Sequence, residues 1–224
     1  DFLLKYFDPV DPLEWLTGGG KVEPGKKPGF LLSFDDGLRE VYTDLAPYLI
    51  MRGIKAVVFV NPMFVNNAGL FYRYKASLLI NHLNFSSKLI WKKVSKVFDT
   101  NPEFLVRKIL QTGYNNRDIF DEAGTVAGFS FDSFSEDYQP YMSSGQIEEL
   151  KNAGFLIGGH SLDHPLFSEM DIHEQVRQCT SSVMWVKENY NVPYGLFAFP
   201  FTDYGIGSGF FAEIEKNSQI NFTF

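Results

Sequence analysis

Short apolar runs alternate along this chain with stretches whose apolar residues recur at helical spacing. The runs are typical of strands buried on both faces, and they predict strands at residues 29–34, 56–60, 155–159, 195–199 and 220–224. The periodic stretches predict helices at residues 38–52, 143–153, 171–190 and 210–217. This alternation indicates a parallel sheet with helices outside. Five strands fit part of a larger barrel better than a complete open sheet.

Local signals support the ends of these elements. Gly53 is well placed to end the helix at residues 38–52. Ser143 and Gln146 form a capping-box pattern at the start of the helix at residues 143–153. Residues 18–29 are rich in Gly, Lys and Pro, and we expect them to form a loop that leads into the first strand.

Residues 66–140 interrupt the alternation of strands and helices. The segment is too long for an ordinary crossover connection, and it shows helical patterns at residues 72–98 and 102–111. We interpret it as a helical insertion within a single domain that spans residues 1–224, and we expect His82 to have a structural role in it. Because the chain stops inside a predicted strand, we also expect further residues beyond its C-terminal end.

Composition and charge exclude several classes of protein. The 224 residues include 20 Lys or Arg and 27 Asp or Glu, and a net charge of −7 without a dense basic stripe argues against nucleic-acid binding. No apolar run approaches the roughly 18 residues of a membrane span. The single cysteine, Cys179, excludes a disulfide scaffold, and its position on the apolar stripe of the helix at residues 171–190 places it in the core.

Polar side chains follow three of the predicted strands directly. Asp35 and Asp36 come after the first strand. His160 and His164 come after the third, and Asp203 lies shortly after the fourth. Because the carboxyl ends of parallel strands meet on one side of a sheet, we expect these side chains to converge there and form an active site.

Each of these short motifs, taken alone, can also be explained without a functional role. An Asp-Gly pair is ordinary turn chemistry, and two histidines four residues apart are about as common on a helix surface or as a hydrogen-bonded pair in a core as at a metal site. Pro165, however, disfavours helix at His164 and favours a loop. Two histidines and one carboxylate form a recognised ligand set for a catalytic zinc or similar ion, with a position left for water. A second carboxylate could then accept the proton of that water.

Two sequence motifs, and a third that matches in part, resemble those of a known protein family. Residues 33–37 read Ser-Phe-Asp-Asp-Gly and resemble the (S/T)-F-D-D-G motif of the polysaccharide deacetylase family, also called the NodB-homology or carbohydrate esterase family 4 domain. Residues 160–165 read His-Ser-Leu-Asp-His-Pro and resemble its H-(S/T)-x-x-H motif. Residues 197–201 read Phe-Ala-Phe-Pro-Phe, where the family has F-R-x-P-Y or F-A-Y-P-Y-G. The resemblance extends from about Gly29 to the end, apart from the insertion.

The resemblance implies a distorted, partly incomplete (β/α) barrel that removes acetyl groups from carbohydrates with the help of a bound metal. Asp36, His160 and His164 would ligate a divalent metal ion, zinc ahead of cobalt, nickel or manganese. Asp35 would act as the general base that takes a proton from water. The substrate would be an acetylated amino-sugar glycan or its precursor, with N-acetyl groups favoured over O-acetyl groups.

Three further residues are candidates for supporting roles. Ser161 would orient the histidine loop by hydrogen bonding, with a simple turn serine as the alternative. A backbone N–H near Phe201 would stabilise the oxyanion, which is implied by the resemblance only. Asp203 would supply a polar contact in the cleft or, equally, serve as a turn residue.

The chain also departs from the family pattern. Ala198 stands where the family has the Arg that pairs with the catalytic Asp, and Phe201 stands where it has Tyr. The late His motif that protonates the leaving group has no counterpart before Phe224. Two alternatives therefore stay open: a catalytically inactive carbohydrate-binding relative, and a metal-dependent amidohydrolase that acts on a non-sugar amide. The family resemblance favours an extracytoplasmic location, whereas the lack of a visible leader leaves the cytoplasm open.

Overall fold

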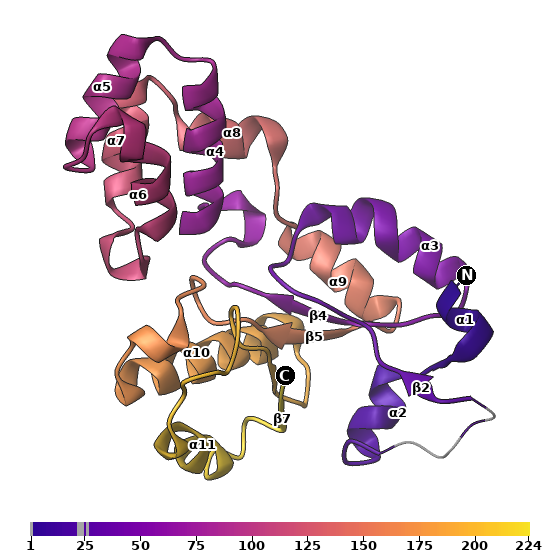
Figure 1. Ribbon diagram of the computed structural model, residues 1–224. Coiled ribbons are helices and arrows are strands. Elements are labelled where there is room, and N and C mark those ends of the chain that lie inside the picture. Colours follow the sequence, from indigo (N-terminus) through magenta and orange to yellow (C-terminus); the bar gives the residue numbers. More distant parts are fainter. Residues whose placement is uncertain (1, 22–24, 26) are drawn as a thin grey trace. The chain divides into compact units, whose positions relative to one another are not determined.

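A computed structural model describes residues 2–21, 25 and 27–224, and the chain forms two compact units (Figure 1). Unit 1 comprises Asp1–Asn66 and Pro140–Phe224. Unit 2 comprises Asn67–Gln139 and contains the helices of the segment between them. The loop predicted at residues 18–29 lies in part outside the described residues.

A five-stranded parallel sheet forms the centre of unit 1. Its strands, in spatial order, are β3 (Ser33–Phe34), β4 (Val57–Val60), β5 (Leu156–Gly159), β6 (Leu196–Phe197) and β7 (Phe222–Thr223). The spatial order follows the chain order, and the sheet curls into a half-barrel. This confirms the predicted α/β class and the partly incomplete barrel.

The first predicted strand, at residues 29–34, is wrong as a single element. Its first half is β2 (Gly29–Phe30), which pairs with β1 (Asp8–Pro9) in a separate two-stranded sheet. Its second half is β3, the edge strand of the main sheet. Leu31 and Leu32, which connect the two strands, are half-buried.

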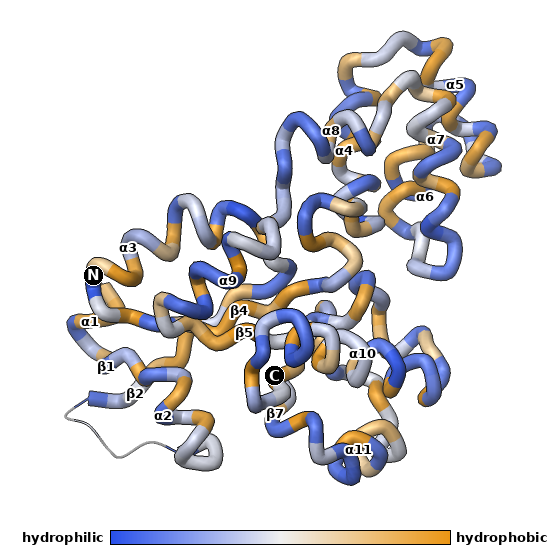
Figure 2. Tube along the Cα trace, turned by 180° about the vertical axis from the view of Figure 1, so that it is seen from behind, coloured by the Kyte–Doolittle hydropathy of each residue, from blue (hydrophilic) through white to orange (hydrophobic). Residues whose placement is uncertain are grey.

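The two faces of the sheet pack against different partners. Val58 and Val60 point to the face covered by η1 (Val41–Leu45, a π-helical turn), α3 (Ala46–Met51), α9 (Ser144–Asn152) and α10 (Ile172–Tyr190). Val57 and Phe59 point to the opposite face, where they pack with Leu196 and Phe222. Successive strand residues alternate between faces, so burial of both faces explains the continuous apolar runs. Figure 2 shows β4 and β5 as a hydrophobic centre.

Two helices of unit 1, α9 and α10, start within one residue of the prediction, whereas the helix predicted at residues 38–52 consists of η1 followed by α3. The capping box of α9 is confirmed, since Ser143 Oγ accepts from the Gln146 backbone N–H at 3.2 Å and Gln146 Oε1 accepts from the Ser143 N–H at 2.9 Å. The described part of unit 1 also contains the 3₁₀ turn η5 (Phe167–Glu169) and the helices α1 (Phe2–Tyr6), α2 (Pro12–Thr17) and α11 (Ser208–Glu215). Neither α1 nor α2 was predicted, because both are too short to show helical periodicity.

Hydrogen bonds join the two points at which the chain leaves and re-enters unit 1. Asn66 Oδ1 accepts from the Ser144 backbone N–H at 2.8 Å, and Asn66 Nδ2 donates to Ser144 Oγ at 3.1 Å. The Asn66 N–H donates to the Met142 carbonyl at 3.1 Å. The two chain segments that lead out of unit 1 and back into it are therefore held together by hydrogen bonds within unit 1.

Unit 2 is entirely helical in its described secondary structure. Its helices are α4 (Tyr72–Asn84), α5 (Lys88–Val97), α6 (Leu105–Gln111), α7 (Ile119–Ala127) and α8 (Phe131–Tyr138), with the 3₁₀ turns η3 (Pro102–Phe104) and η4 (Tyr114–Asn116); a further turn, η2 (Val65–Asn67), precedes them. The predicted helix at residues 72–98 is two helices, because Ser87 caps a new start by accepting from the Ile90 N–H at 3.4 Å.

The helices of unit 2 enclose a core of their own. Leu79, Leu83, Val94, Ile109 and Phe120 are fully buried there. The ring Nε2 of His82 lies 3.1 Å from the carbonyl oxygen of Ala127 and links α4 to α7, as a structural histidine would. Among the described residues of both units, no helix combines the length and apolar character that crossing a membrane requires.

Candidate metal centre

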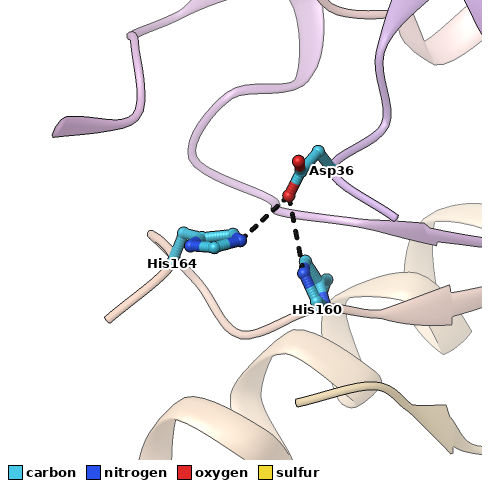
Figure 3. Close-up of side chains that lie close together, drawn as sticks. All are labelled: Asp36, His160 and His164. Carbon is cyan, nitrogen blue, oxygen red and sulfur yellow. Dashed lines mark ion pairs between the residues drawn. The ribbon is translucent and has the colours of Figure 1, made fainter. Parts of the chain in front are cut away.

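Three side chains from two strand ends converge in unit 1 (Figure 3). Asp36 follows β3, and His160 follows β5. The Oδ1 atom of Asp36 lies 2.9 Å from Nε2 of His164 and 3.5 Å from Nε2 of His160. One potential ligand atom from each residue lies within 4.8 Å of the other two. The structure thus brings together the three residues predicted as metal ligands.

The hydrogen bond that His160 makes on the side away from Asp36 determines which ring nitrogen carries the hydrogen. Nδ1 of His160 lies 2.9 Å from the carbonyl oxygen of Ala198. A carbonyl oxygen can only accept, so Nδ1 carries the hydrogen and the lone pair of the neutral ring is on Nε2. That lone pair faces a carboxylate oxygen. A cation between them, either a proton or a metal ion, relieves this repulsion.

The electrostatics of Asp36 are dominated by its burial and by the two imidazoles. Burial alone would raise the pKa of the Asp36 carboxyl, but the imidazoles of His160 and His164, when they carry a proton, lower it more, and the net pKa lies well below its usual range. Apart from these imidazole nitrogens, no donor in the described part of the chain satisfies the buried Oδ1 atom. Asp36 is therefore ionised at neutral pH, as a metal ligand must be.

The arrangement fits a divalent metal ion. Two ligand atoms at about 2.0–2.1 Å from a tetrahedral zinc lie roughly 3.3 Å apart. The observed separations of 2.9 and 3.5 Å lie on either side of this value. Two imidazole nitrogens and one carboxylate oxygen also leave a coordination position free, which is the donor set of catalytic rather than structural zinc sites.

Backbone strain is concentrated around this cluster. Asp36, Ser161, His164 and Phe201 have φ angles of 68°, 62°, 63° and 64°, in the left-handed region that residues with a side chain rarely adopt. Gly37 follows with a φ of 66°. Such strain costs on the order of 1–3 kcal/mol per residue and persists only where surrounding contacts hold it. Contacts that hold the histidine loop are therefore part of the site.

Ser161 provides one such contact. It lies between the two histidines in the sequence and is fully buried. Its Oγ accepts a hydrogen bond from the backbone N–H of His164 at 3.0 Å. This bond closes a tight loop that sets the backbone of His164 relative to His160. The predicted orienting role of Ser161 needs a contact of this kind.

Asn61 provides a second contact that the sequence analysis missed. It follows β4 directly and is buried, and its Nδ2 donates to the carbonyl oxygen of His160 and lies 3.3 Å from that of Ser161. The sequence analysis predicted a strand up to residue 60 and assigned no role to the residue that follows it. Its position at a strand end, like that of the other site residues, was the available signal.

Gln178 of α10 holds the histidine loop from the other side. Its Oε1 accepts from the Leu162 N–H at 2.8 Å, and its Nε2 donates to Asp163 Oδ1 at 2.8 Å. Gln178 is almost completely buried on a helix face that also contains Cys179. A polar side chain on that apolar face was the signal that sequence reasoning overlooked.

The sequence profile of polysaccharide deacetylases matches residues 22–206, which is more than half of the chain. The chain belongs to the polysaccharide deacetylase family. No curated protein matches it.

Solved structures with the same fold include two that are deacetylases by name. The BpsB deacetylase domain from Bordetella bronchiseptica is 16% identical, with 99% of this chain and 73% of that chain covered and a TM-score of 0.57. IcaB from Ammonifex degensii is 18% identical, with 96% and 66% covered and a TM-score of 0.52. The Streptococcus pyogenes deacetylase PplD, in complex with acetate, is 14% identical, with 90% and 60% covered and a TM-score of 0.51. This chain thus spans less than two thirds of the latter two.

The departures from the family motifs have visible structural counterparts. The side chain of Ala198 is buried in a cluster with Phe59 and Leu196, and its carbonyl orients His160. The ring of Phe201 is 52% exposed and meets the His164 ring edge-on, with centroids 4.7 Å apart. A turn closed by the Thr202 N–H and the Pro200 carbonyl, 2.7 Å apart, holds Phe201 there.

The remaining predicted residues lie outside the cluster. Among the described residues, the three-residue cluster includes neither Asp35 nor Asp203. Asp35 is exposed on the turn that carries Asp36. Asp203 is exposed, and its carbonyl accepts from the Ile206 N–H at 3.2 Å in a turn. The roles predicted for Asp35 and Asp203 stay predictions.

Proposed function

We propose that this chain is a metal-dependent deacetylase that hydrolyses acetyl groups of a carbohydrate, N-acetyl ahead of O-acetyl. The observation that carries the proposal is the convergence of Asp36 Oδ1 with the Nε2 atoms of His160 and His164. Membership of the polysaccharide deacetylase family supports the reaction class. The ion we propose is zinc, with cobalt, nickel and manganese as alternatives that the same donor atoms accept.

Each residue of the cluster has a defined task in this proposal. Asp36, His160 and His164 hold the ion, and the Ala198 carbonyl keeps His160 in the required tautomer. A bound divalent ion supplies Lewis-acid chemistry, which polarises an acyl carbonyl and acidifies water.

Asp35 would move the proton of the reaction. It lies next to Asp36 on the same turn and is exposed, so water can reach its carboxylate. In hydrolysis of an N-acetyl group, water adds to the carbonyl carbon and the C–N bond breaks, with acetate and a sugar amine as products. A carboxylate that takes one proton from water and returns it to the departing nitrogen balances these steps.

The surroundings of the cluster suit a sugar. The exposed ring of Phe201 lies against His164, and aromatic rings stack on the apolar faces of sugar rings. We propose a glycan of the cell envelope or an exported glycan, or a precursor of either, as the substrate.

Metal analysis combined with an acetate-release assay tests the proposal. We expect near-stoichiometric zinc or a similar ion and acetate release from N-acetylated glycans in the wild type, and loss of both in His160→Ala. His173→Ala is the matched control, because His173 is exposed and lies outside the cluster. Acetate release that survives in a metal-free His160→Ala variant would overturn the proposal.

One observation favours a second candidate, a catalytically inactive carbohydrate-binding relative. Where the family pairs an Arg with its catalytic Asp, this chain has Ala198, whose buried side chain offers no charge. Glycan binding without acetate release under any of the four metals would support this candidate. A panel that includes simple amides separates both from an amidohydrolase that acts on non-sugar substrates.

A further inference from the structure

The outer side of α5 in unit 2 carries a row of lysines. Lys88, Lys92 and Lys96 recur every four residues and therefore lie in one row along the helix. Leu89 and Lys93 lie in the adjacent row, and all five side chains are exposed. We call these five residues the α5 lysine face. The buried side chain of Val94 lies on the opposite side of the helix.

This face is positively charged, and its own helix contributes no acidic side chain. No Asp or Glu occurs between Asp44 and Asp99, although the whole chain has a net charge of −7. Lys75 of α4 is paired with Asp121 at 2.6 Å, whereas no ion pair in the described part of the chain engages a lysine of the α5 lysine face. The sequence analysis found no dense basic stripe because the helical repeat, not adjacency in sequence, aligns these residues.

Two apolar side chains protrude beside the lysines. Phe85 precedes the helix and is 87% exposed, and Leu89 on the face itself is 62% exposed. Neither side chain belongs to the core of unit 2, which buries Leu83 and Val94 instead. Lysines alone would attract any polyanion. Protruding aromatic and aliphatic side chains beside them indicate a partner that is both anionic at its surface and apolar beneath it.

We propose that the α5 lysine face and Phe85 form a docking surface for an anionic lipid bilayer. The helix lies along the bilayer, the lysine ammonium groups contact lipid phosphates, and the two apolar side chains enter the boundary between headgroups and acyl chains. The lysine stems can reach upward to the phosphates while Phe85 and Leu89 are immersed. This inference concerns unit 2 alone and does not rest on the proposed deacetylase activity.

Sedimentation of the full chain with large vesicles tests the proposal. We expect binding to vesicles that contain phosphatidylglycerol, weaker binding at higher salt, and no binding to pure phosphatidylcholine. Lys92→Gln/Lys96→Gln should bind roughly 25-fold more weakly, because each lysine near an anionic surface contributes about a fivefold factor. Lys5→Gln/Lys216→Gln removes two exposed lysines of unit 1 as a matched control and should bind like the wild type.

The apolar pair distinguishes a bilayer from a soluble polyanion. Phe85→Ser/Leu89→Ser should weaken vesicle binding by at least about tenfold, whereas Ile50→Ser/Met51→Ser, which changes exposed apolar residues of unit 1, should not. Vesicle binding that Phe85→Ser/Leu89→Ser leaves unchanged, or polyphosphate binding as tight as vesicle binding, would overturn the lipid assignment in favour of an anionic polymer.

A fluorescence measurement gives an independent readout of insertion. Phe85→Trp should gain emission that vesicles quench when their acyl chains are brominated, beyond the quenching seen for the wild-type tryptophans. Unchanged emission and no added quenching would overturn the proposal even if lysines produce some sedimentation. All substituted side chains are exposed, and the thermal midpoint of each variant should equal that of the wild type.

Discussion

Nδ1 of His160 donates a hydrogen bond to the carbonyl oxygen of Ala198 over 2.9 Å. The bond links the loop after β5 to the end of β6. The backbone that follows β6 therefore orients a side chain that follows the neighbouring strand β5. Because the acceptor is a carbonyl of the main chain, substitutions at position 198 leave it in place. Another small side chain that fits the buried cluster at position 198 would therefore leave the orientation of the His160 ring unchanged.

Ala198→Arg should not recreate the arginine pairing of the family. The side chain of Ala198 is buried beside Phe59 and Leu196, where a guanidinium finds neither space nor a partner. We expect a loss of roughly 3 kcal/mol or more in the free energy of unfolding and no gain in acetate release. Urea unfolding and the acetate assay measure the two effects. A stable Arg variant with raised activity would show that an arginine at this position reaches Asp35.

Asn61→Ala should weaken metal binding without touching a ligand. The substitution removes the donor to the His160 carbonyl, so the strained histidine loop loses one of its supports. We expect a 10- to 100-fold loss in zinc affinity, measured against a competing chelator, and the same loss for Asn61→Asp, which cannot donate. Asn84→Ala, an exposed asparagine of α4, serves as the control. Unchanged affinity in both Asn61 variants would mean that other contacts hold the loop.

Gln178→Glu should have a defect that depends on pH. A glutamate still accepts from the Leu162 N–H, but when ionised it cannot donate to Asp163 and repels that carboxylate. We expect the variant to lose roughly 1–3 kcal/mol of stability at pH 7 and to recover part of it as the new carboxyl takes up a proton near pH 5. Gln111→Glu on the surface of unit 2 should show neither effect. A loss that is constant with pH would contradict this explanation.

Tyr190 should make the protein less stable in alkali. Burial raises the pKa of Tyr190 from 10.0 to about 12. Between these values the unfolded chain has released a proton that the folded chain retains, so stability is complete below pH 10 and falls as the pH rises. The slope should reach about 1.4 kcal/mol per pH unit. Tyr190→Phe should flatten the curve of unfolding free energy against pH in this window, and an unchanged slope would assign the effect to other groups.

The convergence of Asp36, His160 and His164 could be predicted from sequence because it depends only on strand order. Residues that directly follow parallel strands share one side of a sheet, whatever the details of packing. The two short motifs then restricted the chemistry. The same logic applies to Asn61, which follows β4 directly but was not included among the candidate site residues.

Other features depend on contacts that a local pattern does not contain. Gln178 supports the histidine loop only because one face of α10 packs against that loop. The helix residue is distant from Leu162 in the sequence. The split of residues 29–34 into β2 and β3 depends on which partner strand each half finds. The break of the helix predicted at residues 72–98 depends on Ser87 competing successfully as a cap.

The hydrogen bonds between Asn66 and Ser144 have an engineering consequence. The chain leaves unit 1 and returns to it at one hydrogen-bonded point, and residues 67–139 contribute no strand to the sheet whose strands precede Asp36 and His160. We expect residues 67–139 to be replaceable by a short turn, or by a foreign domain whose ends lie close together, with zinc still bound by the remainder. The same position would then be an insertion point at which related chains carry different domains while the metal-binding residues stay the same.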